Sequence, residues 1–244
     1  MHAGFIMLRS FWETAHPAFS HISYKGHLGS EDALKKKWQR EWLHHYNGTL
    51  GGATVVEYGI GGGLLGKHLF EDYGIARYIG IDISDRQVAN ATRRLAGYNA
   101  RIERVDALSA SIVSNETPTL VVSQAVIQHF ESLSYFQAFA RQLSLIKAPR
   151  VMLQTRLGET RDNQLGETRA NQKFNLKDVQ FALLLSTSTL LESLPDYKLV
   201  WNSTHPAHKS SYAFYGLELL PRPLPTSLVN ERFHSDPSNP VLSR

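Results

Sequence analysis

Residues 53–66 read Ala-Thr-Val-Val-Glu-Tyr-Gly-Ile-Gly-Gly-Gly-Leu-Leu-Gly, and the rest of the chain can be ordered around them. A short β-branched run ends at Glu57, four glycines follow, and a helical pattern begins at Leu64. This predicts a strand, a tight turn and a helix N-terminus. Glycines reach positive φ without a Cβ clash and let a ligand lie against bare backbone. The free N–H groups at a helix start favour the polar or negative end of that ligand.

A second strand pattern covers residues 77–83, Arg-Tyr-Ile-Gly-Ile-Asp-Ile, and contains an acid, Asp82, near its end. In doubly wound α/β folds, the acid that ends the second strand commonly bonds the ribose hydroxyls of a nucleotide. Together the two stretches predict a βαβ unit that binds a nucleoside.

The spacing of the acid and the glycines separates two classes of cofactor. Dinucleotide enzymes use G-x-G-x-x-G and need no acid before the first glycine. Here the pattern is Glu57-x-Gly59-x-Gly61-x-Gly63. It resembles motif I of the class I S-adenosylmethionine (SAM) dependent methyltransferases of the small-molecule type, and the resemblance extends over residues 50–220.

The resemblance implies SAM as the cofactor and a set of residues that hold it. The family's acid, here Glu57, contacts the SAM amino group directly or through water, and Asp82 would hold the ribose hydroxyls. Residues 105–107, Val-Asp-Ala, look like the family's adenine motif; the alternative is that Asp106 caps the next helix. The cofactor-binding candidates are Glu57, Gly59, Gly61, Gly63, Asp82, Ile83, Asp106, Ala107, Ser123 and Gln124.

The candidate catalytic residues follow the fourth predicted strand. The segment Gln-Ala-Val-Ile-Gln-His-Phe at 124–130 resembles its counterpart in small-molecule methyltransferases, and it lacks the Asn/Asp-Pro-Pro-Tyr/Phe pattern of nucleic-acid amino-methylating enzymes. Ser123, Gln124 and His129 are expected beside the sulfonium, at the carboxyl edge of the sheet. His129 is the candidate general base because imidazole titrates near neutrality, with a structural role as its alternative. Gln128 is a similar polar candidate.

Residues 1–50 are predicted to form a helical lid or substrate cap. A helix over 30–46 begins at a Ser with two acids in its first turn, and ends at Asn-Gly. Trp38 and Trp42 share one face of it and are candidates for substrate binding, unless that face packs on the sheet edge or a neighbouring helix. Tyr24 is a catalytic candidate, because the resemblance places a Tyr near the SAM carboxylate.

Residues 51–220 are predicted to be the SAM-binding catalytic domain, and 221–244 an extended tail. The fold class is a doubly wound α/β domain with a mostly parallel seven-stranded sheet and a C-terminal antiparallel hairpin, an order typical of class I methyltransferases. A six-residue turn containing Pro206 is expected to join the last two strands. The further predicted strands are 99–105, 120–123, 150–155, 197–204 and 211–219, and the predicted helices are 64–73, 84–95, 133–146 and 174–194.

The loop after the fifth predicted strand contains a duplication. Residues 157–164, Leu-Gly-Glu-Thr-Arg-Asp-Asn-Gln, recur almost unchanged at 165–172, which indicates an insertion in a surface loop. In this fold the loop borders the acceptor pocket, and Arg suits the bidentate binding of a carboxylate or phosphate. Arg156 is therefore a substrate-binding candidate for an anionic acceptor, with plain solvation as the alternative.

Composition limits the compartment and the partners. The chain has 244 residues, no Cys and a net charge of +4. Without Cys there is no disulfide, thiol nucleophile or zinc–thiolate site, and the histidines show no metal spacing, so no metal is expected. The densest basic cluster, 35–40, reads as a solvated helix face rather than a nucleic-acid patch. No stretch approaches 18 apolar residues, so no membrane partner is expected, and the cytoplasm is the default location.

The sequence thus predicts methyl transfer from SAM to a small molecule by a monomer or homodimer. Two alternatives stay open. The same sulfonium can react at its aminopropyl carbons, by aminocarboxypropyl transfer or by cyclisation or lysis of SAM itself, with release of methylthioadenosine, because binding residues do not choose which carbon reacts. The chain could also be a SAM-binding, non-catalytic partner subunit that uses its Trp-rich helix as an interface.

Overall fold

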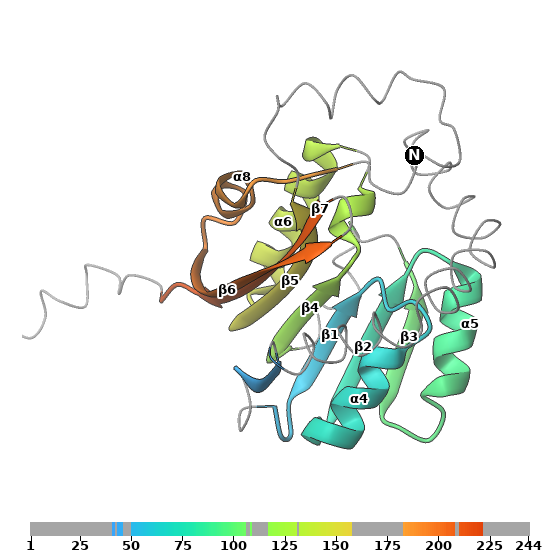
Figure 1. Cartoon of the computed structure of the whole chain (residues 1–244). Coiled ribbons are helices and arrows are strands. Elements are labelled where there is room, and N and C mark those ends of the chain that lie inside the picture. Colours follow the sequence, from blue (N-terminus) through green and yellow to red (C-terminus); the bar gives the residue numbers. More distant parts are fainter. Residues whose placement is uncertain are drawn as a thin grey trace, which may run out of the picture.

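Figure 1 shows the computed structural model of the chain, an open sheet with helices on both faces. It describes residues 41, 43–45, 50–105, 108, 117–130, 132–157, 183–207 and 210–221, and of these it describes 156, 205–207 and 210–212 by their backbone only. The strands are β1 Thr54–Tyr58, β2 Arg77–Asp82, β3 Ala100–Arg104, β4 Leu120–Gln124, β5 Arg150–Leu157, β6 Tyr197–Ala207 and β7 Ser210–Leu219.

The seven strands form one sheet in the order β3-β2-β1-β4-β5-β7-β6. The first five pair in parallel, and β7 runs antiparallel to both of its neighbours, β5 and β6. β1 has β2 on one side and β4 on the other, so the chain reverses its winding direction between them. Ligands of open α/β sheets bind at the carboxyl ends of the strands at such a point. The predicted doubly wound sheet with its C-terminal antiparallel hairpin is confirmed.

The helices are α4 Leu64–Tyr73, α5 Asp85–Arg94, α6 Leu133–Ile146 and α8 Thr187–Glu192, with the short 3-10 helix η2 at Ile127–His129. In Figure 1, α4 and α5 lie on one face of the sheet, and α6 lies on the other. The predicted bounds of α4 and α6 are confirmed, because their signals are local. Ser132 caps α6 by accepting from the Tyr135 N–H at 3.1 Å, and the C-terminal residue Gly74 of α4 is left-handed.

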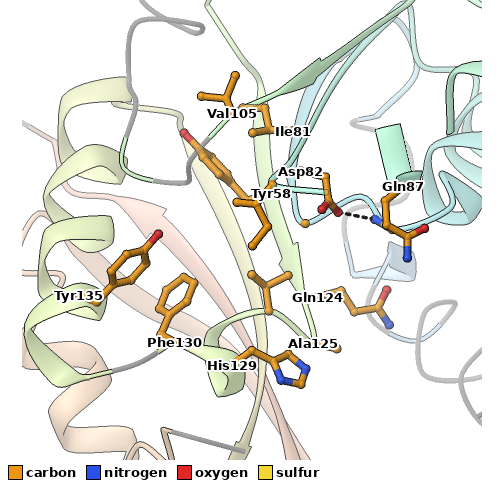
Figure 2. A pocket seen from close by; sticks show the side chains of 14 residues that line it. Tyr58, Ile81, Asp82, Gln87, Val105, Gln124, Ala125, His129, Phe130 and Tyr135 are labelled. Atoms are coloured by element: carbon orange, nitrogen blue, oxygen red, sulfur yellow. Dashed lines mark hydrogen bonds between the residues drawn. The ribbon is translucent and has the colours of Figure 1, made fainter. Parts of the chain in front are cut away.

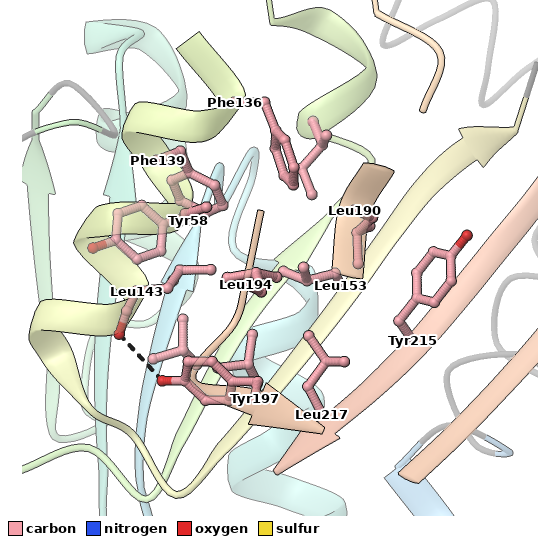
Figure 3. Packing of buried hydrophobic residues seen from close by; sticks show 14 of the residues in the cluster. Tyr58, Phe136, Phe139, Leu143, Leu153, Leu190, Leu194, Tyr197, Tyr215 and Leu217 are labelled. Atoms are coloured by element: carbon pink, nitrogen blue, oxygen red, sulfur yellow. Dashed lines mark hydrogen bonds between the residues drawn. The ribbon is translucent and has the colours of Figure 1, made fainter. Parts of the chain in front are cut away.

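Each face of the sheet has its own apolar core. Successive residues of a strand point to opposite faces, so Val56 and Tyr58 join the core under α6, whereas Val55 joins the core under α4. Figure 3 shows the α6 core, in which Tyr58 meets Phe139 edge-on with ring centroids 5.1 Å apart. β1 is therefore buried on both faces, as its continuous apolar run predicts.

The predicted helix over 174–194 is wrong in its described part. Residues 183–186 are not helical, and α8 occupies only 187–192. Ser186 is extended, and its hydroxyl accepts a hydrogen bond from the Thr189 N–H at 3.1 Å. A run of Ser and Thr favours such a cap over a helix interior, because the side chains compete for the backbone hydrogen bonds. Residues 174–182 lie outside the described residues.

The predicted six-residue turn around Pro206 is also wrong. β6 continues through this residue, and the ladder with β7 extends to Pro206–Ser211 and Ala207–Ser210. β6 is the outermost of the described strands, and its partner in the sheet is β7. A proline is tolerated there because an edge strand has one side without ladder partners for its N–H groups.

Little of the N-terminal region is described. Residues 41, 43 and 44 are helical, Leu43 is buried in the α4 core, and the ring of His45 stacks on Trp201 of β6 at 6.0 Å. The end of the predicted helix therefore packs on the sheet. The rest of that helix, the duplicated loop beyond residue 157 and the tail beyond residue 221 lie outside the described residues.

Candidate functional site

The turn between β1 and α4 has the geometry that its glycines predict. Gly59, Gly61 and Gly63 have φ of 75°, 50° and 74°, which L side chains rarely adopt. The Gly59 N–H donates to the Ile81 carbonyl at 2.7 Å, which ties the turn to β2. A Cβ on Gly59 would lie 2.1 Å from Cγ2 of Val126, so the turn after β1 touches the turn after β4 directly. Position 59 therefore requires glycine, because the backbone has a positive φ and Val126 leaves no space for a Cβ.

A cavity of about 230 Å³ opens where β1, β2 and β4 end. Figure 2 shows its lining, with Asp82 and Gln87 grouped apart from Phe130 and Tyr135. Its lining residues come from the ends of β1, β2 and β4 and from the segments that follow these strands and β3: Tyr58, Gly59, Gly61, Ile81, Asp82, Ile83, Gln87, Val105, Gln124, Ala125, Val126, His129, Phe130 and Tyr135. The cavity thus lies at the reversal point of the sheet.

The predicted site residues fall into three groups by position. Those that line the cavity are Gly59, Gly61, Asp82, Ile83, Gln124 and His129. Those that lie beside it without lining it are Glu57, Gly63, Ser123 and Gln128. Those outside the described residues are Tyr24, Trp38, Trp42, Asp106, Ala107 and the side chain of Arg156.

Asp82 connects the two turns that meet at the cavity. Its Oδ2 accepts the Gly61 N–H at 3.0 Å, and its Oδ1 accepts the Ser84 N–H at 3.0 Å. Ser84 caps α5 by accepting the Gln87 N–H at 3.3 Å, as its sequence position predicts. In the reciprocal half of a capping box, the side chain at position 87 would accept the Ser84 N–H. Here Asp82 accepts it, and Gln87 lines the cavity instead.

Glu57 is buried, with 3% of its surface exposed, and Oε2 accepts a hydrogen bond from the hydroxyl of Tyr78 at 2.5 Å. Burial raises the pKa of Glu57 to about 8; the Tyr78 hydrogen bond lowers it, and the nearby Asp82 carboxylate raises it. Tyr78 thus holds the Glu57 carboxyl under the glycine turn, although Tyr78 is not part of the motif from Glu57 to Gly63. The available signal was Tyr78 among the interior residues of β2, which are otherwise apolar between Arg77 and Asp82.

His129 belongs to η2, directly after β4, and its Nε2 lies 3.4 Å from Nε2 of Gln128. Gln128 is buried, its backbone carbonyl accepts the Leu183 N–H at 3.3 Å, and its Oε1 has no hydrogen-bond partner in the described part of the chain. Phe130 and Tyr135 adjoin His129 in the lining, with their ring centroids 4.8 Å apart. This end of the cavity is therefore aromatic and polar.

Ser123 is not among the residues that line the cavity. It pairs in register with Tyr58, and its fully buried hydroxyl has no hydrogen-bond partner among the described residues. Gln124, the next residue, lines the cavity.

Sequence reasoning missed several lining residues, among them Val126, Phe130 and Tyr135. Tyr135 stands in the first turn of α6, three residues after the Ser132 cap. A helix that follows a parallel strand begins near the carboxyl edge of the sheet, and this positional signal was available.

The charges of the cavity lining are few. Among the described residues that line it, Asp82 is the one carboxylate, and neither Lys nor Arg occurs. Within the described ranges, no three His, Asp or Glu side chains gather as they would around a metal ion. In the same part of the chain, no helix combines the length and apolarity needed to cross a membrane.

Comparison with known proteins agrees with this geometry. Residues 55–148 match the family model described as methyltransferase domain, a span that runs from β1 to just past the end of α6. No curated protein has a significantly similar sequence.

Three solved structures illustrate the shared fold. Magnesium protoporphyrin IX methyltransferase (ChlM) from Synechocystis PCC 6803 with bound SAM has 16% identity, covers 90% of this chain and 99% of its own, and gives a TM-score of 0.66. The N-methyltransferase NodS from Bradyrhizobium japonicum WM9 in complex with S-adenosyl-L-homocysteine (SAH) has 13% identity, coverage of 90% and 100%, and a TM-score of 0.63. The [4+2]-cyclase SpnF has 15% identity, coverage of 75% and 80%, and a TM-score of 0.58.

The family match and the sheet order agree with each other. Residues 55–148 match the model of the methyltransferase domain family, and most of the chain shares the fold of the solved methyltransferase structures. The solved structures, at these low identities, add agreement in fold.

Proposed function

We propose that this protein transfers the methyl group of SAM to a small-molecule acceptor. The observation that supports it best is that one cavity combines the glycine turn after β1, Asp82 at the end of β2 and His129 after β4. Methyl transfer needs a cofactor end and an acceptor end in one enclosed space, because the reacting atoms must be aligned and water excluded.

The cofactor end is the part built by the first two strands. When bound, SAM supplies an activated methyl group on its sulfonium. Asp82 would accept the ribose hydroxyls, with its carboxylate oriented by the N–H groups of Gly61 and Ser84. Ile83 and Val105 offer apolar surface for the adenine. Glu57, Gly59, Gly61, Gly63 and Gln124 complete the proposed set, together with Asp106, Ala107 and Ser123, which stay predictions.

The acceptor end is the part built after β4. Phe130 and Tyr135 would pack against the acceptor, and His129 would take its proton or orient its nucleophile. The unpartnered Oε1 of Gln128 is a further group that can orient His129 or a bound water. Tyr24, Trp38 and Trp42 stay predictions for the covering of this end.

A separate hypothesis is that the acceptor is anionic. The cavity lining contains no Lys or Arg among its described members, so a carboxylate or phosphate on the acceptor would have to reach Arg156 or the duplicated loop. The backbone of Arg156 lies in β5, opposite Tyr212. An anionic acceptor therefore predicts that Arg156→Ala raises the KM for the acceptor and leaves SAM binding unchanged.

The test is mass spectrometry of the protein incubated with SAM alone and then with a pooled metabolite extract. We expect SAH only with the extract, together with a product that is one methyl group heavier. Methylthioadenosine formed from SAM would instead support the second candidate, chemistry at the aminopropyl carbons. Failure to form either product would support the third reading, a non-catalytic SAM-binding subunit.

The second candidate is retained for a specific reason. SpnF, which shares this fold, is described as a [4+2]-cyclase, so the fold is compatible with chemistry other than methyl transfer. The domain limits at residues 50 and 220, the monomer or homodimer, the absence of nucleic-acid partners and the cytoplasmic location stay predictions from the sequence.

A further inference from the structure

Tyr78 is fully buried in the core under α4, yet its hydroxyl ends on a carboxyl group. The phenol donates to Oε2 of Glu57 at 2.5 Å, so this hydrogen bond uses one of the two carboxyl oxygens. In the register of β1 and β2, Tyr78 is opposite Val55, and Glu57 is opposite Gly80. The ring must therefore lean along its own strand, past Gly80, to reach the carboxyl.

Two glycines make room for this ring. A Cβ on Gly80 would lie 2.8 Å from Cε1 of Tyr78 and 2.7 Å from Cγ2 of Ile60. A Cβ on Gly66, in α4, would lie 2.8 Å from Cζ of Tyr78. All three distances are shorter than real Cβ contacts. The ring therefore has little room to leave this position, and the direction of its hydroxyl is determined by packing as well as by the hydrogen bond.

We infer that Tyr78 is a positioning residue for SAM: it fixes the Glu57 carboxyl so that its second oxygen serves the cationic amino group of the cofactor. This inference rests on the proposed function. Tyr78 lies on β2, outside motif I, and its phenol would act on the cofactor through Glu57 without touching the cofactor.

The surrounding charges support a cationic ligand group. The titratable groups that act on Glu57 are Tyr78 and Asp82, both on β2. The buried residues of α4 and α5, Leu65, Gly66, Leu69, Gln87 and Ala91, carry no charge, and the β4 partner of Glu57 is Val122. The Asp82 carboxylate thus acts on the nearby Glu57, and the described cavity lining contains neither Lys nor Arg. Burial raises the pKa of Glu57 to about 8, so binding of an ammonium group near pH 7 should release a proton.

The test compares two ligands that share a nucleoside and differ in the amino-acid end. SAH has the α-amino group, and methylthioadenosine lacks it. We would measure the Kd of both by titration calorimetry for the full chain and for Tyr78→Phe, which keeps the ring. Tyr98→Phe is the matched control, because Tyr98 donates to Glu71 on the surface of the same aromatic stack. We expect Tyr78→Phe to weaken SAH about tenfold, with methylthioadenosine and the control unchanged.

Equal weakening of both ligands, or no weakening of SAH, would overturn the inference while leaving the proposed function intact. Failure of the unchanged chain to bind either ligand would overturn both.

Two further measurements keep the test valid if Tyr78→Phe does not fold. SAH binding to the unchanged chain at pH 7 should release a proton, measured in two buffers of different ionisation enthalpy. Glu57→Gln should abolish that release.

Discussion

The N–H of Gly61 and Oδ2 of Asp82 are 3.0 Å apart, so the turn after β1 and the end of β2 form one hydrogen-bonded unit at the mouth of the cavity. The other oxygen of Asp82 accepts the Ser84 N–H before α5. One carboxylate therefore orders both loops, and the proposed ribose ligand is also the residue that shapes the nucleoside end.

Asp82→Asn tests this double role. The amide has one carbonyl oxygen and a donor in place of the second acceptor, so one of the two backbone N–H groups loses its partner. An unsatisfied group costs about 1–3 kcal/mol, and we expect both a lower Tm and a SAM Kd raised at least tenfold. Thermal unfolding and calorimetric titration check it. Unchanged SAM affinity with a lower Tm would reduce Asp82 to a structural role.

Gly59→Ala should disrupt the site at the contact between the two turns. The added methyl group would lie 2.1 Å from Val126 Cγ2, on a backbone with φ of 75°. We expect a loss of about 1–3 kcal/mol in unfolding free energy and a large loss of SAM affinity. Gly51→Ala is the control, because a Cβ there meets nothing within 4 Å and φ is not positive. Equal behaviour of the two variants in urea unfolding would contradict the packing argument.

His129→Asn separates catalysis from cofactor binding. Asn can retain a hydrogen bond to the acceptor but cannot take its proton at neutral pH. If His129 is the general base, kcat should fall about 10²–10⁴-fold with little change in the Kd for SAM. Steady-state kinetics with the identified acceptor checks this. A fall of less than tenfold would leave His129 as an orienting residue.

Tyr197→Phe should affect stability and not activity. Its hydroxyl is shared between the carbonyls of Leu143, at 3.1 Å, and Ala148, at 3.3 Å, on the α6 side (Figure 3) and far along the chain from the cavity lining. Removing it takes a donor from both carbonyls, although the Leu143 carbonyl keeps the Lys147 N–H at 3.1 Å, and should cost about 0.5–1.5 kcal/mol. Urea unfolding should show the loss, and SAM affinity should not change. A change in affinity would indicate coupling between α6 and the cavity.

Glu57→Gln should become more stable than the unchanged protein as the pH rises. Burial raises the folded-state pKa of Glu57 from 4.5 to about 8, so between these values the folded state binds more protons than the unfolded state. Stability must then fall with rising pH, by at most about 1.4 kcal/mol per pH unit from this group, and below pH 4.5 the effect vanishes. Gln cannot ionise and keeps an oxygen for Tyr78. Unfolding at pH 5, 6, 7 and 8 should show the stability difference growing in favour of the variant, and a constant difference would contradict the assignment.

The sequence by itself determined the elements whose signals are local. α4 and α6 have their predicted bounds because an apolar period, a Ser cap and a terminal glycine or left-handed residue act within a few positions of one another. The turn at Gly59–Gly63 was predictable for the same reason, and so was Asp82, whose place at a strand end determines its position on the sheet edge. The helix predicted over 174–194 differs in its described part, because Ser186 caps α8 and the helix begins only at Thr187.

Only the tertiary structure decided which side chains meet. The strand order places β4 beside β1, which brings Val126 onto Gly59 and adds Phe130 and Tyr135 to the cavity, although these residues are far from motif I in the chain. The register of β1 with β2 sets Gly80 opposite Glu57 and lets the ring of Tyr78 pass. Pro206 is accommodated because β6 is an edge strand. These contacts depend on strand pairing between distant segments, and no local pattern of residues specifies them.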